Sequence, residues 1–226
     1  MLCSMDLDDS NAELHTLELS GAMLSNALMS TQDGLQVYVD SCATNAFAHT
    51  AQNALVRTKL SSPKKIKCGS SFAVARTAAI TEFASLSADG SVWLASVERV
   101  IESEDFHKDL NITSLTQSVD EGGMSIGSKM DGMYGDASSK DPSSIIPIAR
   151  TAQNMPYVTR FSMEHATASG KPIRDATTGK PYARNAAILR LNASLSASAS
   201  KTEPRRTASK AHTPSNDLHN IQADTM

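Results

Sequence analysis

The stretch that most constrains the fold of this chain runs from residue 141 to residue 195. It opens with a proline-marked segment, turns through two Gly-Lys-Pro sequences at residues 170–172 and 179–181, and ends in the apolar sequence AAILRL at residues 186–191. Glycine and proline interrupt regular structure, whereas the apolar residues on either side recur at helical spacing. The stretch therefore predicts two amphipathic helices separated by a loop.

The composition favours the same fold class. Aromatic residues make up only 4% of the 226 residues, and alanine with scattered leucine and isoleucine favours closely packed helices. A chain of this length can form one medium-sized domain with long arms. We therefore expect a mainly α-helical fold with an acidic N-terminal arm at residues 1–40, a helical core at 41–193 that contains a Gly-rich loop at 118–144, and a flexible C-terminal arm at 194–226.

Apolar residues at helical spacing predict further helices before this stretch. The only short alternating segment lies at residues 35–39, which we expect to be extended. The predicted helices cover residues 12–29, 43–56 and 72–83, and the apolar residues of 92–101 continue at helical spacing.

Charge is distributed unevenly along the chain. The formal net charge is −3, but residues 1–40 carry −7, residues 41–149 carry −2 and residues 150–226 carry +6. This asymmetry predicts that the C-terminal third meets any polyanion. A solvated basic face explains the same charge equally well.

Several classes of protein are disfavoured by the residues themselves. Cys3, Cys42 and Cys68 form no CxxC sequence, and the six histidines show no metal-ligand spacing, so no metal or cofactor is expected. The sequence shows no signal-peptide pattern and no apolar run long enough to span a membrane, so no membrane partner is expected.

One short segment matches a catalytic motif. Residues 123–127 (GMSIG) match the nucleophile elbow of serine hydrolases, and Asp141 and His165 follow Ser125 in the chain order of a triad. The elbow needs a buried strand before it, and the polar residues 117–122 do not predict one. We therefore expect no enzyme, and a hydrolase using Ser125 is a minor alternative.

Arg160 and Glu164 stand four residues apart on one of the predicted helices. As an exposed pair they stabilise a helix by only ~0.2–0.5 kcal/mol. Beside an RNA groove the acid would instead orient basic groups, and the arginine would grip a phosphate.

Five short motifs occur along the chain in an order that resembles the coat proteins of flexuous filamentous plant viruses of the potyvirus type. The resemblance extends across residues 43–221, and each motif taken alone is short. The motifs are residues 43–47 (ATNAF), residues 80–85 with 89–93 (ITEFAS and DGSVW), residues 160–164 (RFSME), residues 186–189 (AAIL), and residues 202–208 with 218–221 (TEPRRTA and LHNI).

The resemblance implies a viral coat protein that binds genomic single-stranded RNA without sequence specificity. It implies a homo-oligomer, a helical filament joined through the terminal arms, found in the virion and in the host cytoplasm. In that family a serine, an arginine and an acid line the RNA pocket, which implies Ser85 and Glu164 here. Thr116 stands where the family has its arginine, so Lys129 or Arg160 would have to supply the positive charge.

An alternative is a soluble helical binding or scaffold protein of unknown partner, whose motif matches are coincidental. Salt-sensitive RNA binding with filament growth would separate the coat protein from this alternative.

Overall fold

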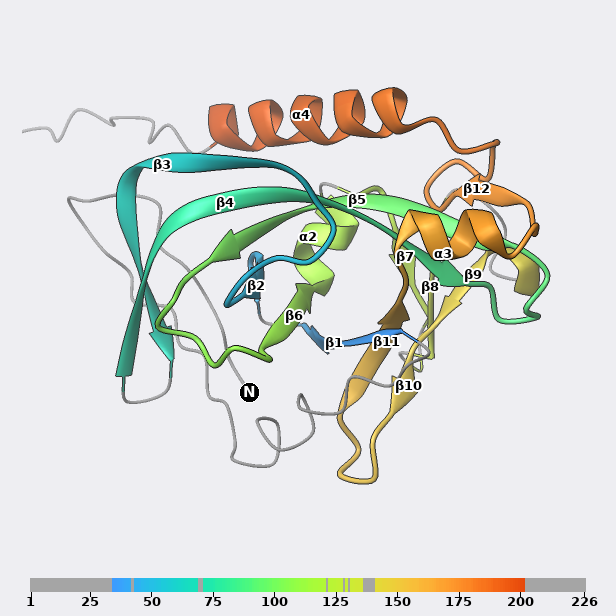
Figure 1. Ribbon diagram of the computed structural model, residues 1–226, viewed down its shortest axis with the longest axis horizontal. Coiled ribbons are helices and arrows are strands. Elements are labelled where there is room, and N and C mark those ends of the chain that lie inside the picture. The colour runs from blue at the N-terminus through green and yellow to red at the C-terminus, as the bar shows by residue number, and fades with distance from the viewer. Residues whose placement is uncertain are drawn as a thin grey trace, which may run out of the picture.

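The computed structural model describes residues 34–41, 43–68, 71–120, 122–127, 129, 131–135 and 141–201, and these residues form a mainly β structure (Figure 1). The strands form one nine-stranded sheet and one three-stranded sheet. The strands are β1 (Leu35–Asp40), β2 (Ala46–Ala48), β3 (Ala54–Cys68), β4 (Ser71–Leu86), β5 (Trp93–Glu102), β6 (Asn111–Ser114), β7 (Ser125–Ile126), β8 (Gly132–Tyr134), β9 (Ile145–Pro147), β10 (Ala149–Arg150), β11 (Pro156–Arg160) and β12 (Ile173–Asp175). The helices are α2 (Leu115–Asp120), α3 (Met163–Ala168) and α4 (Arg184–Lys201), with a 3-10 turn, η1, at Pro142–Ser144.

The predicted mainly α-helical fold is wrong. Residues 72–83, predicted as a helix, lie in β4, whose backbone pairs with β3 on one side and β5 on the other. The high helix propensity of alanine is a weak preference, and backbone pairing on both sides with burial of small side chains outweighs it. The helix predicted for residues 43–56 is also wrong, since this segment forms β2 and the start of β3, and residues 92–101 lie mostly in β5.

Of the two amphipathic helices predicted in residues 141–195, the second is present as α4, and the first is replaced largely by a strand. The AAILRL sequence lies in α4, but residues 156–160 form β11, and α3 begins only at Met163. Ser162 caps α3 by accepting a hydrogen bond from the His165 backbone N–H. The extended segment predicted at residues 35–39 is confirmed as β1.

The large sheet closes on itself. Its strands follow the order β10-β11-β1-β6-β2-β5-β4-β3, and β12 pairs with the start of β5. Two backbone hydrogen bonds between Ala84 of β4 and Phe161 after β11, of 3.0 and 2.8 Å, join strands that are far apart in this order. The path from β11 through β1, β6, β2, β5 and β4 therefore returns to β11 and encloses an interior.

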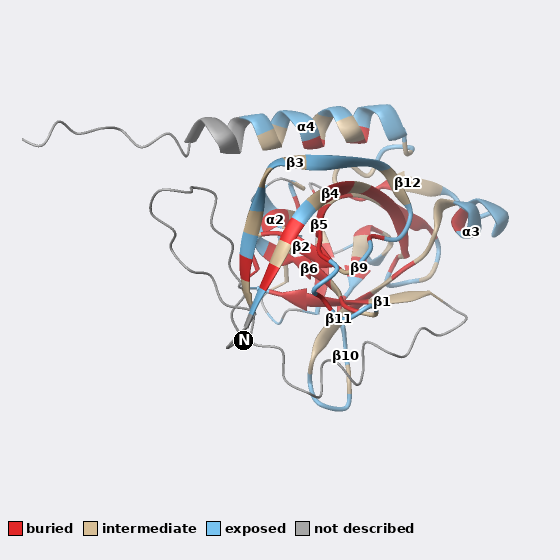
Figure 2. Ribbon diagram, turned by 60° about the vertical axis from the view of Figure 1, so that its left-hand side comes forward, coloured by how far each residue is buried: buried red, intermediate tan, exposed pale blue. Residues whose placement is uncertain are grey.

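The interior of the closed sheet is mostly apolar, with charged residues near its middle. Val37, Val39, Leu94 and Val158 pack there against the three-stranded sheet β7-β8-β9. Figure 2 shows this buried region in red, enclosed by the curved strands. The longest strands, β3 and β4, extend past the other strands as a hairpin at the left of Figure 1.

Helix α4 lies along the outside of the sheet, above β3 and β4 in Figure 1. Ala187 and Leu191 are buried beneath it, whereas Leu189 is exposed. Among the described residues, no helix is both long enough and apolar enough to cross a membrane.

The predicted domain boundaries stay predictions. Strand β1 falls within the predicted N-terminal arm, and α4 runs across the predicted boundary at residues 193 and 194. Strands β7 and β8 lie in the loop predicted at residues 118–144. The helix predicted at residues 12–29 and the motif at residues 202–221 lie outside the described residues.

Candidate nucleic-acid interface

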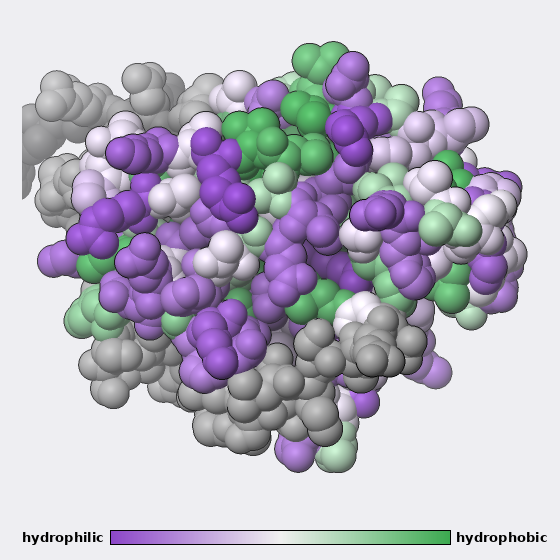
Figure 3. Space-filling view, in the orientation of Figure 1, coloured by the Kyte–Doolittle hydropathy of each residue, from purple (hydrophilic) through white to green (hydrophobic). Residues whose placement is uncertain are grey.

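The hairpin formed by β3 and β4 carries a concentration of positive charge. We define the β3–β4 arm as residues 54–81, which include no aspartate or glutamate. In Figure 2, β3 is pale blue over much of its length, so its side chains are largely exposed, and the same region is mostly hydrophilic in Figure 3. The cations of the arm are Arg57, Lys59, Lys64, Lys65, Lys67 and Arg76.

Near the far end of the arm, side chains alternate between two environments. Ile66 and its partner Ala73 are buried in the core. Lys67 and its partner Phe72 therefore point to the opposite side, together with Lys65. Phe72 is 51% exposed, which is unusual for an aromatic side chain in a paired strand. The arm thus presents a half-exposed aromatic ring beside two lysines.

Lys64 lies on the other side of β3 from Lys65 and is paired with Ala75. Its pKa is lowered, first by burial and then by the positive charge of Arg99. An anion bound nearby would favour the charged form of Lys64 and so raise its pKa towards the ordinary value.

A cleft of about 580 Å³ lies at the base of the arm. Within it, Arg57 forms an ion pair of 3.1 Å with Glu102 and donates a hydrogen bond of 2.7 Å to the Ala51 carbonyl. Glu102 also accepts the Ala51 N–H at 2.8 Å. Arg57 therefore holds the arm to the sheet, and its charge is neutralised.

The structure brings two of the predicted RNA-binding residues, Ser85 and Arg160, to one cavity inside the closed sheet. The cavity has a volume of only about 40 Å³, room for roughly one or two waters and too small for a nucleotide. Ser85 is buried and donates to the Thr159 carbonyl at 2.9 Å.

Arg160 does not pair with Glu164. It is 8% exposed, and its guanidinium lies 2.5 Å from a carboxylate oxygen of Glu98 and 2.9 Å from the Thr113 hydroxyl. The guanidinium also lies 3.6 Å from the centre of the Phe83 ring, and Thr113 donates to the second oxygen of Glu98. These contacts identify Arg160 as part of a buried, paired charge network rather than a phosphate contact.

The three other predicted residues lie in three separate places. Thr116 is exposed on α2, where its hydroxyl donates to the Ser41 carbonyl at 3.3 Å. Lys129 is exposed between β7 and β8, and Glu164 is exposed on α3. With Ser85 and Arg160 facing the interior, the five predicted residues do not line one groove.

The residues of the alternative hydrolase have separate partners. Ser125 is exposed in β7, and Asp141 accepts hydrogen bonds from the backbone and hydroxyl of Ser143 at the start of η1. The ring of His165 stacks on Phe161, with centroids 4.9 Å apart. Within the described part of the chain, no hydrogen bond or ion pair joins any two of the three, so the structure offers this hypothesis no assembled triad.

Besides Arg160, two further cations of the basic C-terminal third are neutralised. Arg184 forms two hydrogen bonds, of 2.8 and 2.7 Å, with the buried Glu82, and Arg190 pairs with the buried Asp175. These ion pairs attach α4 to the sheet. The contact with a polyanion predicted for this third stays a prediction.

The charge of the arm is hidden in the sequence when charge is averaged over a long segment. Residues 41–149 have a net charge of −2, which conceals six cations and no acids within residues 54–81. Counting charge over residues 54–81 alone reveals the positive charge of the arm. The position of Phe72, exposed beside Lys67, requires the register of β3 and β4.

No family model, no curated protein and no solved structure matches this chain.

Proposed function

We propose that this protein binds single-stranded RNA, without sequence specificity, along the β3–β4 arm. The half-exposed Phe72 beside Lys65 and Lys67, on an arm with no acidic residue, is the observation that carries the proposal. Lysines attract the phosphates of any sequence, and an exposed ring stacks on an unpaired base. A duplex offers no free base faces to such a ring, which favours a single strand.

The arm's lysines have a second explanation, because β3 is an edge strand of the sheet. Lysine and proline on an edge strand oppose pairing with other chains, and β3 contains Pro63 as well as its lysines. Protection of an edge does not require an exposed aromatic side chain. Phe72 therefore favours binding as the reason for this surface.

The choice of RNA and the packaging of that RNA into a homo-oligomeric filament rest on the sequence motifs alone. Of those motifs, residues 186–189 lie in α4, whereas residues 80–85 lie in β4 and residues 160–164 span β11 and α3. Electron microscopy of the protein with and without single-stranded RNA tests this finer proposal. RNA-dependent filaments support it, and separate small particles at all salt concentrations contradict it.

Binding to the arm is tested by the fluorescence anisotropy of a labelled oligouridylate at several salt concentrations. The variant carries both Lys65→Gln and Lys67→Gln. We expect about tenfold weaker binding at low salt. We also expect the slope of log affinity against log salt to fall by about 0.7 for each phosphate that the variant no longer neutralises.

The matched control carries Lys171→Gln and Lys180→Gln, which remove two exposed cations outside the arm. We expect it to change affinity and salt dependence much less than the arm variant. Equal effects of the two variants would show that only net charge matters and would contradict a binding site on the arm.

A further inference from the structure

The cleft at the base of the arm is lined by cations that form no ion pair with the described residues. Lys59 on β3 and Arg76 on β4 line it, and neither forms an ion pair among the described residues. The third cation of the cleft, Arg57, is neutralised by Glu102. An anion entering the cleft would therefore meet two available positive charges.

The lining of the cleft also offers hydrogen-bond acceptors. Glu104 lines the cleft without an ion pair among the residues the structure describes, whereas Asp105 accepts the Val74 N–H at 2.8 Å. Glu104 is therefore available to accept hydrogen bonds from hydroxyl or amino groups of a ligand.

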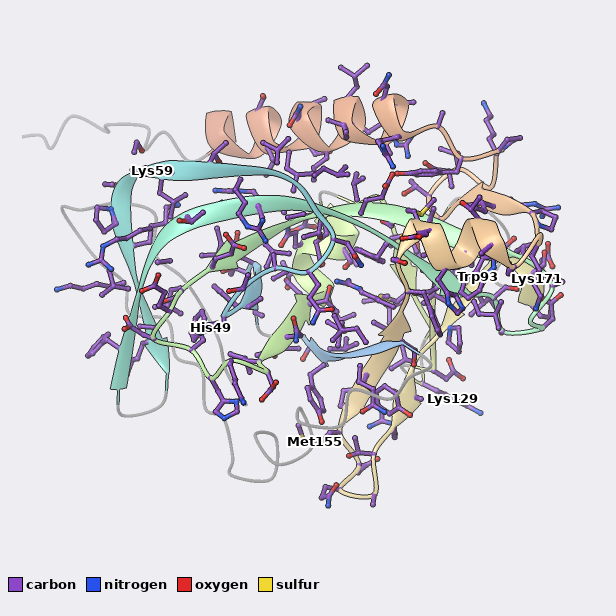
Figure 4. The ribbon with its side chains drawn as sticks, in the orientation of Figure 1. His49, Lys59, Trp93, Lys129, Met155 and Lys171 are labelled. Carbon is purple, nitrogen blue, oxygen red and sulfur yellow. The ribbon has the colours of Figure 1, made fainter. Side chains whose placement is uncertain are left out.

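His49 adds a second acceptor. Its Nδ1 lies 2.8 Å from the Phe106 carbonyl, which can only accept, so Nδ1 carries the hydrogen. In the neutral ring, Nε2 then has a free lone pair. Figure 4 labels His49 after β2 and Lys59 on β3, both in the left half of the view.

The cleft also contains apolar surface, from Leu60, Pro63 and Val74. Its volume of about 580 Å³ falls within the range of roughly 300–1,000 Å³ that is usual for small-molecule sites. A ligand that satisfies all three kinds of surface has an anionic group, several hydrogen-bond donors and a flat apolar part. A nucleotide has all three, whereas an acidic peptide would leave Glu104 facing more negative charge.

We propose that this cleft binds one nucleotide, with its phosphate at Lys59 and Arg76 and its sugar and base facing Glu104, His49 and the apolar residues. The inference rests on the proposed function in one respect, because the strand bound along the arm supplies the nucleotide. It extends that function by adding a pocket for a single nucleotide at the base of the β3–β4 arm.

The test titrates adenosine 5′-monophosphate, adenosine and inorganic phosphate separately into the full chain, followed by ¹H–¹⁵N NMR. We expect the nucleotide to bind more tightly than either of its parts. Arg76→Gln should weaken nucleotide binding about tenfold, because it removes a charge-assisted contact from an exposed residue. The matched control, Lys180→Gln, should leave nucleotide binding unchanged.

Two results would overturn the inference: equal affinity for the nucleotide and for inorganic phosphate, or equal effects of Arg76→Gln and Lys180→Gln. The variant with Lys65→Gln and Lys67→Gln should keep its affinity for adenosine 5′-monophosphate. Failure of the arm proposal appears in the oligouridylate experiment and failure of the cleft proposal in the mononucleotide experiment, so the two are distinguishable.

Discussion

The interior of the closed sheet and the β3–β4 arm both contain basic residues, but in opposite settings. Arg160 is buried, paired with Glu98 and stacked on Phe83. Lys65 and Lys67 lie on the outward side of the arm, on a segment without acids. A buried cation held in an ion pair supports the fold, whereas at least partly exposed cations that form no ion pair with the described residues are available to a ligand.

The proposed RNA contact therefore lies on the arm and not at Arg160, which the sequence motifs favoured. Arg160 occurs in the motif at residues 160–164, but it faces a cavity of about 40 Å³. The position of a basic residue in a motif does not show whether solvent can reach it. The partners of each cation give that information.

The largest effect should come from breaking the interior pair. Arg160→Ala leaves Glu98 as a buried, uncompensated charge, and such changes cost about 3–5 kcal/mol of folding free energy. Urea unfolding at neutral pH measures this loss. The remaining folded protein should bind oligouridylate as the unaltered protein does, because Arg160 does not reach the surface.

The double variant with Glu98→Leu and Arg160→Met provides the control. It removes both charges together, so it should be less destabilised than Arg160→Ala. Unchanged stability in Arg160→Ala together with weakened RNA binding would reverse the comparison and make Arg160 a binding residue.

A smaller effect is expected at the far end of the arm. Phe72→Ala removes a half-exposed ring, so it should change folding stability little, but it should weaken oligouridylate binding. Stacking of one base on an aromatic ring contributes about 1–3 kcal/mol, which corresponds to about fivefold or more in affinity. Fluorescence anisotropy measures the change.

Phe72→Tyr serves as the conservative control, since it keeps a ring for stacking and should retain most of the affinity. If Phe72→Ala and Phe72→Tyr both bind as tightly as the unaltered protein, the ring takes no part and the arm acts through charge alone.

The sequence predicted one strand and one long helix correctly, for reasons visible in the residues. Residues 35–39 alternate briefly, and residues 186–191 are apolar at helical spacing within α4. Residues 72–83 misled the prediction because their apolar residues recur at helical spacing, although small and β-branched side chains fit a closely packed strand as well. Pairing with β3 and β5, the strands before and after it, decided between the two, and the spacing of residues within the segment does not contain that information.

The site was predicted less well, because the exposure of a side chain depends on how its strand pairs with the other strands. Ser85 and Arg160 do lie near each other, but the closure of the sheet between Ala84 and Phe161 turns both inward. The six cations of residues 54–81 were visible in the sequence, whereas Phe72 could only be assigned to the outward side from its partner Lys67.

Raising the pH should change the contributions of Tyr182 and of Lys64, which lies in the arm, to folding stability in opposite directions. Burial, followed by a hydrogen bond to Glu82, raises the pKa of Tyr182, so its contribution to stability is present below about pH 10 and is lost above it. The pKa of Lys64 is lowered instead, so its contribution to stability rises as pH approaches about 10.

Urea midpoints between pH 8 and pH 11 test these signs. Tyr182→Phe should reduce the loss of stability above pH 10, and Tyr38, whose pKa is also raised by burial, accounts for part of what remains. Lys64→Met should remove the opposing rise. A steeper loss in Tyr182→Phe than in the unaltered protein would contradict the assignment.

The smallest effect is expected at Glu164, which the sequence motifs placed in the RNA pocket. Its side chain is exposed on α3, and removing one negative charge from the surface favours an anionic ligand slightly. Glu164→Gln should therefore bind oligouridylate within about twofold of the unaltered protein, and on the tighter side. Anisotropy at low salt, where surface charges matter most, gives the most sensitive measurement. A tenfold loss of affinity would mean that the strand passes over α3, so that the exposed cations of the arm are not the surface that RNA contacts.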